Sequence, residues 1–139
     1  MSGSLVKIDE QIVSSDVATV EIGGNNWDSS FDVYVVKMIG VTGTADSNFE
    51  MRVLKDVSGT PTAQTTANYD RAYRVLYATF SNSNNSNQTS NLINGGYAVG
   101  TDTGESYNAT QYLFNFNNSS EYSFFTQETT FLSSSAALT

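Results

Sequence analysis

The sequence predicts a single all-β domain, residues 1–139, built as an antiparallel β-sandwich. Three observations support this fold class. Several short runs alternate apolar and polar residues with a period of two, and they are rich in β-branched and aromatic side chains. Clusters of Gly, Asn, Asp and Ser separate these runs, and a length of 139 residues suits one domain. Such alternation shows which side chains share a face of a strand, but not which face is buried.

The alternating runs cover residues 17–22, 31–36, 49–54 and 111–116, and we expect each to form a strand. A further run, 121–126, is expected to pair with 111–116 as a hairpin around the four-residue loop Asn117–Ser120. The residues predicted to lie in the core or in an interface are Val20, Ile22, Val33, Val35, Met51, Val53, Leu113, Phe114 and Phe124.

Residues 69–80 fit two periods. Tyr69, Tyr73, Leu76 and Phe80 have helical spacing, but the aromatic and β-branched content of the segment favours a strand. A short helix remains the alternative. The next segment, residues 81–91, reads SNSNNSNQTSN and contains no apolar residue. It is predicted to be a solvated loop that tolerates deletion, and both ends of the chain are predicted to be short flexible tails.

The composition argues against an enzyme. The chain has no His and no Cys, which removes the usual nucleophile and base pairs and the preferred ligands of zinc and copper. A pair of carboxylates among Glu105, Glu121 and Glu128 is the one remaining hydrolytic arrangement, of the type used by glycosidases or lyases. Acidic residues on strands more often face solvent, so we expect no catalytic residue and no cofactor.

Calcium is the one metal for which suitable ligands occur in a pattern. Oxygen-bearing side chains are closely spaced in residues 46–50 and 101–105, but neither segment matches a complete calcium loop. Asp, Asn and Gly are also the ordinary residues of tight turns. Turns are therefore expected at both places, and no bound metal is predicted.

The charge balance limits the partners. With 6 basic and 14 acidic residues the formal net charge is −8, which argues against nucleic acid and against an anionic membrane surface as partners. No segment approaches the roughly 20 apolar residues that span a bilayer, and residues 1–10 do not read as a signal peptide. The protein is expected to be made in a cytoplasm.

A few aromatic residues are candidates for partner contacts. Trp27 lies in a polar segment, where an exposed indole would stack on a sugar or anchor a protein; the favoured alternative is that it folds back over the end of the sandwich. Tyr97 and Tyr107 flank a predicted turn, with the same two alternatives. Phe114 and Phe116 belong to a strand that is apolar on both faces and would meet either the core or a partner.

The order of these segments resembles a known group. Residues 11–20 and 27–36, then Met51-Arg-Val-Leu54, then residues 110–116 with the Ser/Asn loop after them, are similar to small β-sandwich virion surface proteins of tailed phages, especially marine and cyanobacterial phages. The resemblance implies a jelly-roll or lectin-like sandwich with no catalytic residues.

The resemblance also implies a function and a location. It implies a capsid decoration (cement) protein, made in the host cytoplasm and located on the virion surface. Such a protein would bind the major capsid protein or other virion proteins and stabilise the shell, and a homo-oligomer such as a trimer is compatible with it. The alternative is a tail or head fibre module that recognises a host surface glycan.

A last expectation concerns the edge of the sheet. Members of the group continue into further strands beyond the part that this chain covers, so an open edge is expected at residues 111–131, covered by a neighbouring copy or by an extended arm of the capsid protein added as a strand. The alternative is that Phe131 and the Ser- and Ala-rich tail close this edge within the chain.

Overall fold

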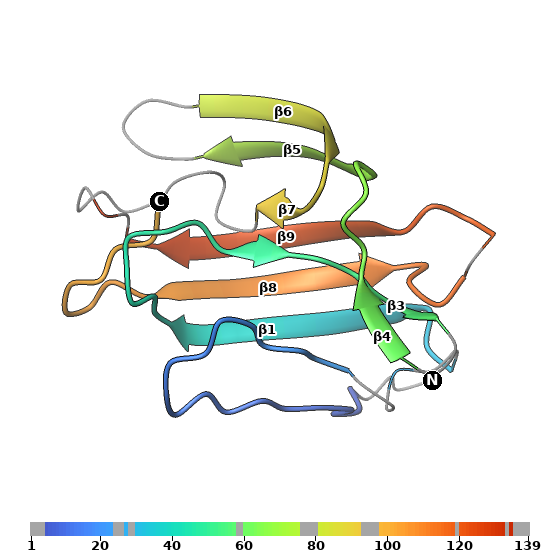
Figure 1. The fold of residues 1–139 in the computed structure, drawn as a ribbon, viewed down its shortest axis with the longest axis horizontal. Helices are drawn as coiled ribbons and strands as arrows, with labels where there is room; N and C mark the ends of the chain where they lie inside the picture. The colour runs from blue at the N-terminus through green and yellow to red at the C-terminus, as the bar shows by residue number, and fades with distance from the viewer. Residues whose placement is uncertain are drawn as a thin grey trace. The chain divides into compact units, whose positions relative to one another are not determined.

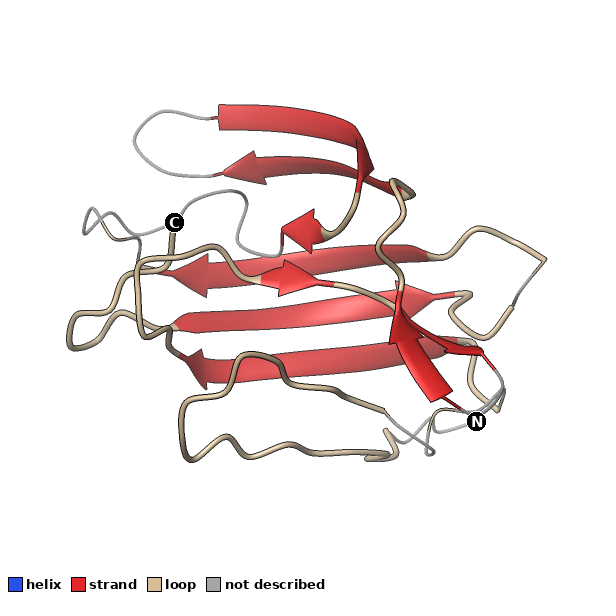
Figure 2. Ribbon diagram, viewed as in Figure 1, coloured by secondary structure: helices blue, strands red, loops and turns tan. Residues whose placement is uncertain are grey.

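The computed structural model describes residues 5–23, 27, 30–57, 60–75, 81–92, 98–118, 120–132 and 134. Every regular element in these residues is a strand and none is a helix, as Figure 2 shows. The prediction of an all-β, antiparallel chain is therefore confirmed. The strands are β1 Val33–Val41, β2 Glu50–Met51, β3 Leu54–Val57, β4 Thr60–Ala63, β5 Tyr69–Val75, β6 Ser81–Gln88, β7 Asn91–Leu92, β8 Tyr107–Phe114 and β9 Phe124–Phe131.

The largest sheet has three strands in the order β1-β8-β9, so that β8 lies between two strands from opposite ends of the chain (Figure 1). Strands β1 and β8 correspond to the runs predicted at 31–36 and 111–116. The predicted hairpin is also present, but with a longer loop, because β8 ends at Phe114 and β9 begins only at Phe124. The chain leaves β8 at Asn115, whose φ of 59° is incompatible with a continuing strand.

The remaining strands form two-stranded antiparallel pairs. Strands β3 and β4 pair from Leu54 opposite Ala63 to Val57 opposite Thr60, and the short strands β2 and β7 pair through two residues each. Strands β5 and β6 form the longest of these hairpins. Their register shifts between Tyr69 and Arg71, close to Asn87, which has a φ of 54° on the partner strand.

This hairpin corrects one prediction and confirms part of another. Residues 81–91 were predicted to be a loop, but residues 81–88 form β6. Strand pairing uses backbone N–H and C=O groups, so a polar segment can pair when a neighbouring strand such as β5 offers its own. The strand interpretation of residues 69–80 is confirmed over Tyr69–Val75, whereas residues 76–80 lie outside the described part of the chain.

The predicted strand at 17–22 is wrong, because residues 5–23 contain no strand. Alternation produces a strand only where a neighbour supplies hydrogen-bond partners, and this segment is held instead by a side chain. The Asp9 carboxylate (Oδ2) accepts a hydrogen bond from the backbone N–H of Gly23 at 2.8 Å and so joins the two ends of the segment. The run at 49–54 is also shorter than predicted, since it is interrupted after Met51 and resumes as β3.

Contacts group the chain into two compact units, although the sequence predicted one domain. Unit 1 comprises Met1–Val35 and Tyr112–Thr126, and unit 2 comprises Val36–Gln111 and Gln127–Thr139. The boundary between the units falls within each of β1, β8 and β9.

The core of unit 2 is a cluster of buried side chains from β8, β9 and the residues before β8. Met38, Phe49 and Met51 pack against this cluster. The Tyr107 ring lies 5.5 Å from the Phe49 ring and 6.0 Å from the Phe131 ring, measured between centroids. The cluster consists of Val99, Tyr107, Ala109 and Phe131.

In unit 1 the buried side chains include Tyr34 on β1 and Leu113 on β8. Leu113 was a predicted core residue, and so was Met51 of unit 2, which contacts the core. The other predicted core residues are less buried than expected: Val35, Val53 and Phe114 are half-buried. As core residues, four are wrong, because their side chains are 43–60% exposed: Val20, Ile22, Val33 and Phe124.

Candidate partner-binding surface

Four aromatic rings of unit 1 pack together around Trp27 and Tyr34. The Trp27 ring stacks on the Tyr34 ring with centroids 3.9 Å apart and planes inclined by 15°. Phe116 meets Trp27 edge-on at 6.2 Å, and Phe31 meets Tyr34 edge-on at 6.0 Å. Trp27 is thus folded back against β1 and half-buried, and Phe116, which is also half-buried, packs against it.

The opposite face of the same strands is open. Side chains alternate across a strand, so Tyr112 and Phe114 lie on the face opposite buried Leu113, and Val33 lies opposite buried Tyr34. On β9, Phe124 is likewise at an exposed position. The exposed fractions are 45% for Val33, 44% for Tyr112 and 60% for Phe124.

The loop between β8 and β9 adds the most exposed ring of this unit. Tyr122 is 85% exposed, and Asn115 fixes the loop that presents it. The Asn115 amide nitrogen donates to the Glu121 carboxylate at 3.2 Å and to the Tyr122 carbonyl at 3.5 Å, while its backbone carbonyl accepts from the Ser123 hydroxyl at 3.2 Å. We call the open surface the aromatic patch; it consists of Val33, Tyr112, Phe114, Tyr122 and Phe124.

The patch belongs to a strongly acidic unit. Unit 1 contains seven acidic residues and one basic residue, a net charge of −6, whereas unit 2 carries −2. The single cation, Lys7, forms an ion pair with Glu10 at 2.8 Å. The backbone N–H groups of Gly23 and Glu10 lower the pKa of Asp9, so this carboxylate stays ionised over a wider pH range. The aromatic patch therefore belongs to the more acidic of the two units.

The predicted contact residues divide into three groups. Phe114 lies on the patch, while Trp27 and Phe116 pack inside unit 1. Tyr107 as a surface platform is wrong, because it is fully buried in the core of unit 2. Tyr97 lies outside the described residues.

Sequence reasoning missed Tyr112 and Tyr122 as individual contact residues. The signal available in the sequence was the apolar character of both faces of the run at 111–116 and of residues 122–125. A sheet that is covered on one face needs apolar side chains on that face only. Apolar side chains on the other face of the run predict an exposed apolar surface, and Tyr112 lies on that face.

Of the three acidic residues considered for chemistry, Glu105 and Glu121 accept hydrogen bonds in turns or loops, whereas Glu128 is exposed on β9. Glu105 is buried, and its Oε2 accepts a hydrogen bond from the backbone N–H of Asp102 at 2.7 Å, while the Glu105 N–H donates to the Asp102 carbonyl at 2.9 Å. The turn predicted at 101–105 is thus confirmed. Within the described ranges, no three side chains of His, Cys, Asp or Glu gather as they would around a metal ion.

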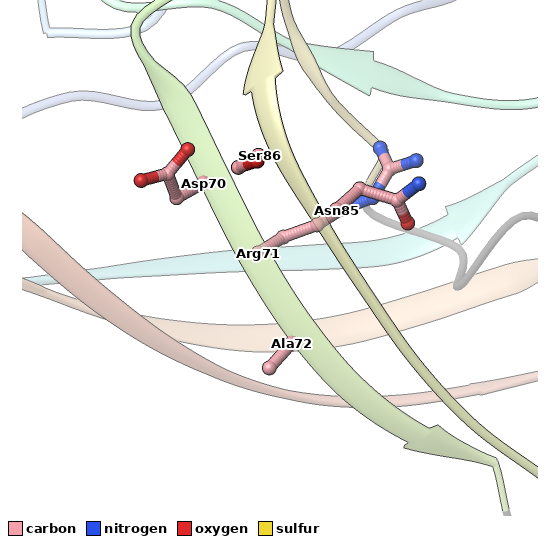
Figure 3. Close-up of a pocket in the computed structure, with 5 residues that line it drawn as sticks. All are labelled: Asp70, Arg71, Ala72, Asn85 and Ser86. Carbon is pink, nitrogen blue, oxygen red and sulfur yellow. The ribbon is translucent and has the colours of Figure 1, made fainter.

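A shallow depression lies on the β5–β6 hairpin of unit 2. It is lined by Asp70, Arg71, Ala72, Asn85 and Ser86. In Figure 3 the side chains of Asp70 and Arg71 point away from each other, so the charged groups do not converge on one point. The Asp70 carboxylate accepts a hydrogen bond from the backbone N–H of Asn87 at 2.9 Å and so links β5 to β6.

Comparison with known proteins gives no assignment: no family model, no curated protein and no solved structure matches this chain. Among the described residues no helix is long and apolar enough to cross a membrane. The features that bear on function are therefore the aromatic patch and the charge of unit 1.

Proposed function

We propose that this chain is a structural protein of a tailed-phage virion surface, a decoration or cement protein that binds the major capsid protein. The aromatic patch carries the proposal. Several exposed large apolar side chains on neighbouring strands and their connecting loop mark a site of contact with partners. Tyrosines and other aromatic anchors provide most of the binding energy in such contacts.

The composition supports a contact role. A chain without His or Cys lacks the groups that most enzymes use near neutral pH, and its acidic residues at Glu105 and Glu121 are engaged in turn hydrogen bonds. A net charge of −8 helps to keep a protein soluble at high copy number until it reaches its place in a particle.

A jelly-roll or lectin-like sandwich, folded as one domain, is part of this proposal. The three-stranded sheet β1-β8-β9 supports it, because alternate residues of β8 are buried while the others are exposed or half-buried. A sheet with one covered and one open face is what a sandwich layer requires.

The second candidate is a fibre module that recognises a host glycan. The observation that favours it is Tyr122, a ring 85% exposed on a loop that also presents the amide side chain of exposed Asn118. Tyrosine rings stack on sugars and neighbouring amides donate to sugar hydroxyls. A glycan array probed with the chain and with Tyr122→Ala tests it; binding that Tyr122→Ala does not weaken contradicts it.

The decoration proposal is tested by locating the protein. An antibody raised against the recombinant chain is used for immunogold electron microscopy of purified phage particles, alongside mass spectrometry of the same particles. Labels distributed over the shell are expected. Labels confined to the tail support the fibre alternative, and particles that lack the chain overturn both.

A further inference from the structure

We propose that the aromatic patch binds an extended segment of another protein that is both apolar and cationic, and that a second copy of this chain is not its occupant. The inference rests on the proposed function only in taking the chain as a protein-binding module. It adds the chemistry of the partner, which the location of the chain in a particle does not reveal.

The first argument is charge. Asp32 and Glu121 are exposed and are next in sequence to Val33 and Tyr122 of the patch, and the unit that carries the patch has a net charge of −6. A second copy would bring the same acidic unit against this one, and like-charged surfaces repel and disfavour association. A segment with Lys or Arg would be attracted instead, and attraction of this kind accelerates encounter.

The second argument is area. An aromatic side chain buries roughly 150–250 Å² when fully covered, so the exposed fractions of Tyr112, Tyr122 and Phe124 amount to roughly 400 Å². A stable dimer of standard size buries about 800 Å² on each partner. The patch offers about half of that, which suits a single segment better than the face of a second folded copy.

The third argument is geometry. In the described part of the chain, β9 is an outer strand of its sheet, and outer strands offer backbone N–H and C=O groups to an added strand. The patch residues on β8 lie at alternate positions, with Tyr112 exposed and Phe114 half-buried. An extended segment also presents every second side chain to one side, so apolar residues at alternate positions would match this spacing.

The experiment titrates the isotope-labelled full chain with two synthetic peptides and follows binding by NMR. One peptide alternates Val with Lys, and the other alternates Val with Glu. We expect the Lys peptide to shift the ring signals of Tyr112, Tyr122 and Phe124, with an affinity that falls as salt rises. The Glu peptide is expected not to bind.

Variants then separate the patch from the rest of unit 1. Phe124→Ser and Tyr122→Ser are each expected to weaken binding of the Lys peptide roughly 10- to 30-fold, as truncation of an aromatic anchor does. Ile12→Ser is the matched control, because Ile12 is 83% exposed in the same acidic unit but lies outside the patch, and it should leave binding unchanged. Circular dichroism confirms that each variant is folded.

Three outcomes overturn the inference: equal binding of the two peptides, absence of binding by the Lys peptide, and a self-association in sedimentation experiments that Phe124→Ser abolishes. The last outcome would make a second copy the occupant. Immunogold labelling of particles is independent of these results. If the peptide experiment fails while the shell is labelled, the decoration role stands and only the partner chemistry is wrong.

Discussion

The Trp27 ring lies flat on the Tyr34 ring, 3.9 Å away between centroids, and this stack joins the segment before β1 to β1 itself. Trp27 is the only tryptophan of the chain. Its fluorescence therefore reports on the packing of unit 1 without contributions from elsewhere. Stacked aromatic pairs contribute about 0.5–1.5 kcal/mol beyond the area that they bury.

Replacing Tyr34 is expected to expose Trp27. Tyr34→Leu removes the stacking partner of a half-buried indole, so the emission maximum should move to longer wavelength. The free energy of unfolding should fall by about 1–3 kcal/mol, because Tyr34 is also buried. Equilibrium denaturation followed by Trp27 fluorescence measures both effects. Tyr122→Leu is the control, since this ring is 85% exposed and the change should cost less than about 0.5 kcal/mol.

Gly100 is predicted to tolerate no side chain while Glu105 is present. A Cβ on Gly100 would lie 1.9 Å from Oε2 and 2.3 Å from Cδ of Glu105. The carboxylate cannot turn away without losing its 2.7 Å hydrogen bond from the Asp102 N–H. We expect Gly100→Ala to reduce the free energy of unfolding by about 1–3 kcal/mol, measured by chemical denaturation.

A second variant identifies the cause of that loss. In the background Glu105→Ala the clashing carboxylate is absent, so adding Gly100→Ala should cost less than about 0.5 kcal/mol. An equal cost in both backgrounds would mean that the backbone at Gly100, and not the Glu105 side chain, sets the limit.

The sequence predicted most of the large sheet and less of the smaller pairs. The runs at 31–36 and 111–116 combine alternation with bulky side chains, and both became strands because β1 and β8 pair with each other in one sheet. The run at 17–22 has the same alternation and formed no strand. Periodicity describes one segment, whereas a strand needs a second segment in register, which no local pattern specifies.

For the same reason, the sequence did not predict which face of each strand is buried. Alternation placed Val33 with Val35 and left Tyr34 on the other side, but it did not say which set is covered. The structure buries Tyr34, so Val33 is exposed and became part of the aromatic patch, while Val35 is half-buried. Polar segments mislead in the opposite direction: residues 81–88 have no apolar side chain to bury, yet their backbone completes the β5–β6 hairpin.

The buried Gln111 depends on one neighbour. Its side chain is fully buried, and its Nε2 donates to Oε1 of Gln127, while its own Oε1 has no hydrogen-bond partner among the described residues. Gln127→Leu should cost about 1–3 kcal/mol, because the Gln111 amide then loses its acceptor as well.

The double variant Gln111→Leu, Gln127→Leu should be more stable than Gln127→Leu alone, because the double variant leaves no amide at position 111 without a hydrogen-bond partner. Urea denaturation of the three proteins at neutral pH measures the difference. A double variant that is less stable than the single one would show that Gln111 stabilises the core by another contact.

Tyr107 is expected to make the fold sensitive to alkali. Burial raises the pKa of Tyr107 to about 12, and a hydrogen bond with Thr129 offsets part of the rise. Because this pKa exceeds the value of 10.0 of an unperturbed tyrosine, the stabilisation is complete below pH 10 and is lost as the pH rises toward 12. The loss should reach roughly 2 kcal/mol.

The comparison with Tyr107→Phe isolates the contribution of this group from that of the other ionisable side chains. Denaturation at pH 9 and again near pH 11.5 should show a smaller drop for Tyr107→Phe than for the parent chain. Parallel curves for the two proteins would place the alkaline sensitivity elsewhere.

Asn115 is predicted to couple the turn after β8 to the aromatic patch. Its φ of 59° favours Gly or Asn, and its side chain donates to both Glu121 and the Tyr122 carbonyl. Asn115→Gly keeps a residue that adopts the left-handed backbone easily but loses the side-chain hydrogen bonds. Asn115→Ala loses the hydrogen bonds and also strains the backbone. We expect the free energy of unfolding to fall by up to about 1 kcal/mol in the Gly variant and by about 1–3 kcal/mol in the Ala variant. In both variants Tyr122 should be held less rigidly, which NMR relaxation of the residue 116–123 amides measures.

Equal stability of the two variants would show that the side-chain hydrogen bonds, and not the left-handed backbone, account for the effect. An unchanged loop in both would separate Asn115 from the presentation of Tyr122.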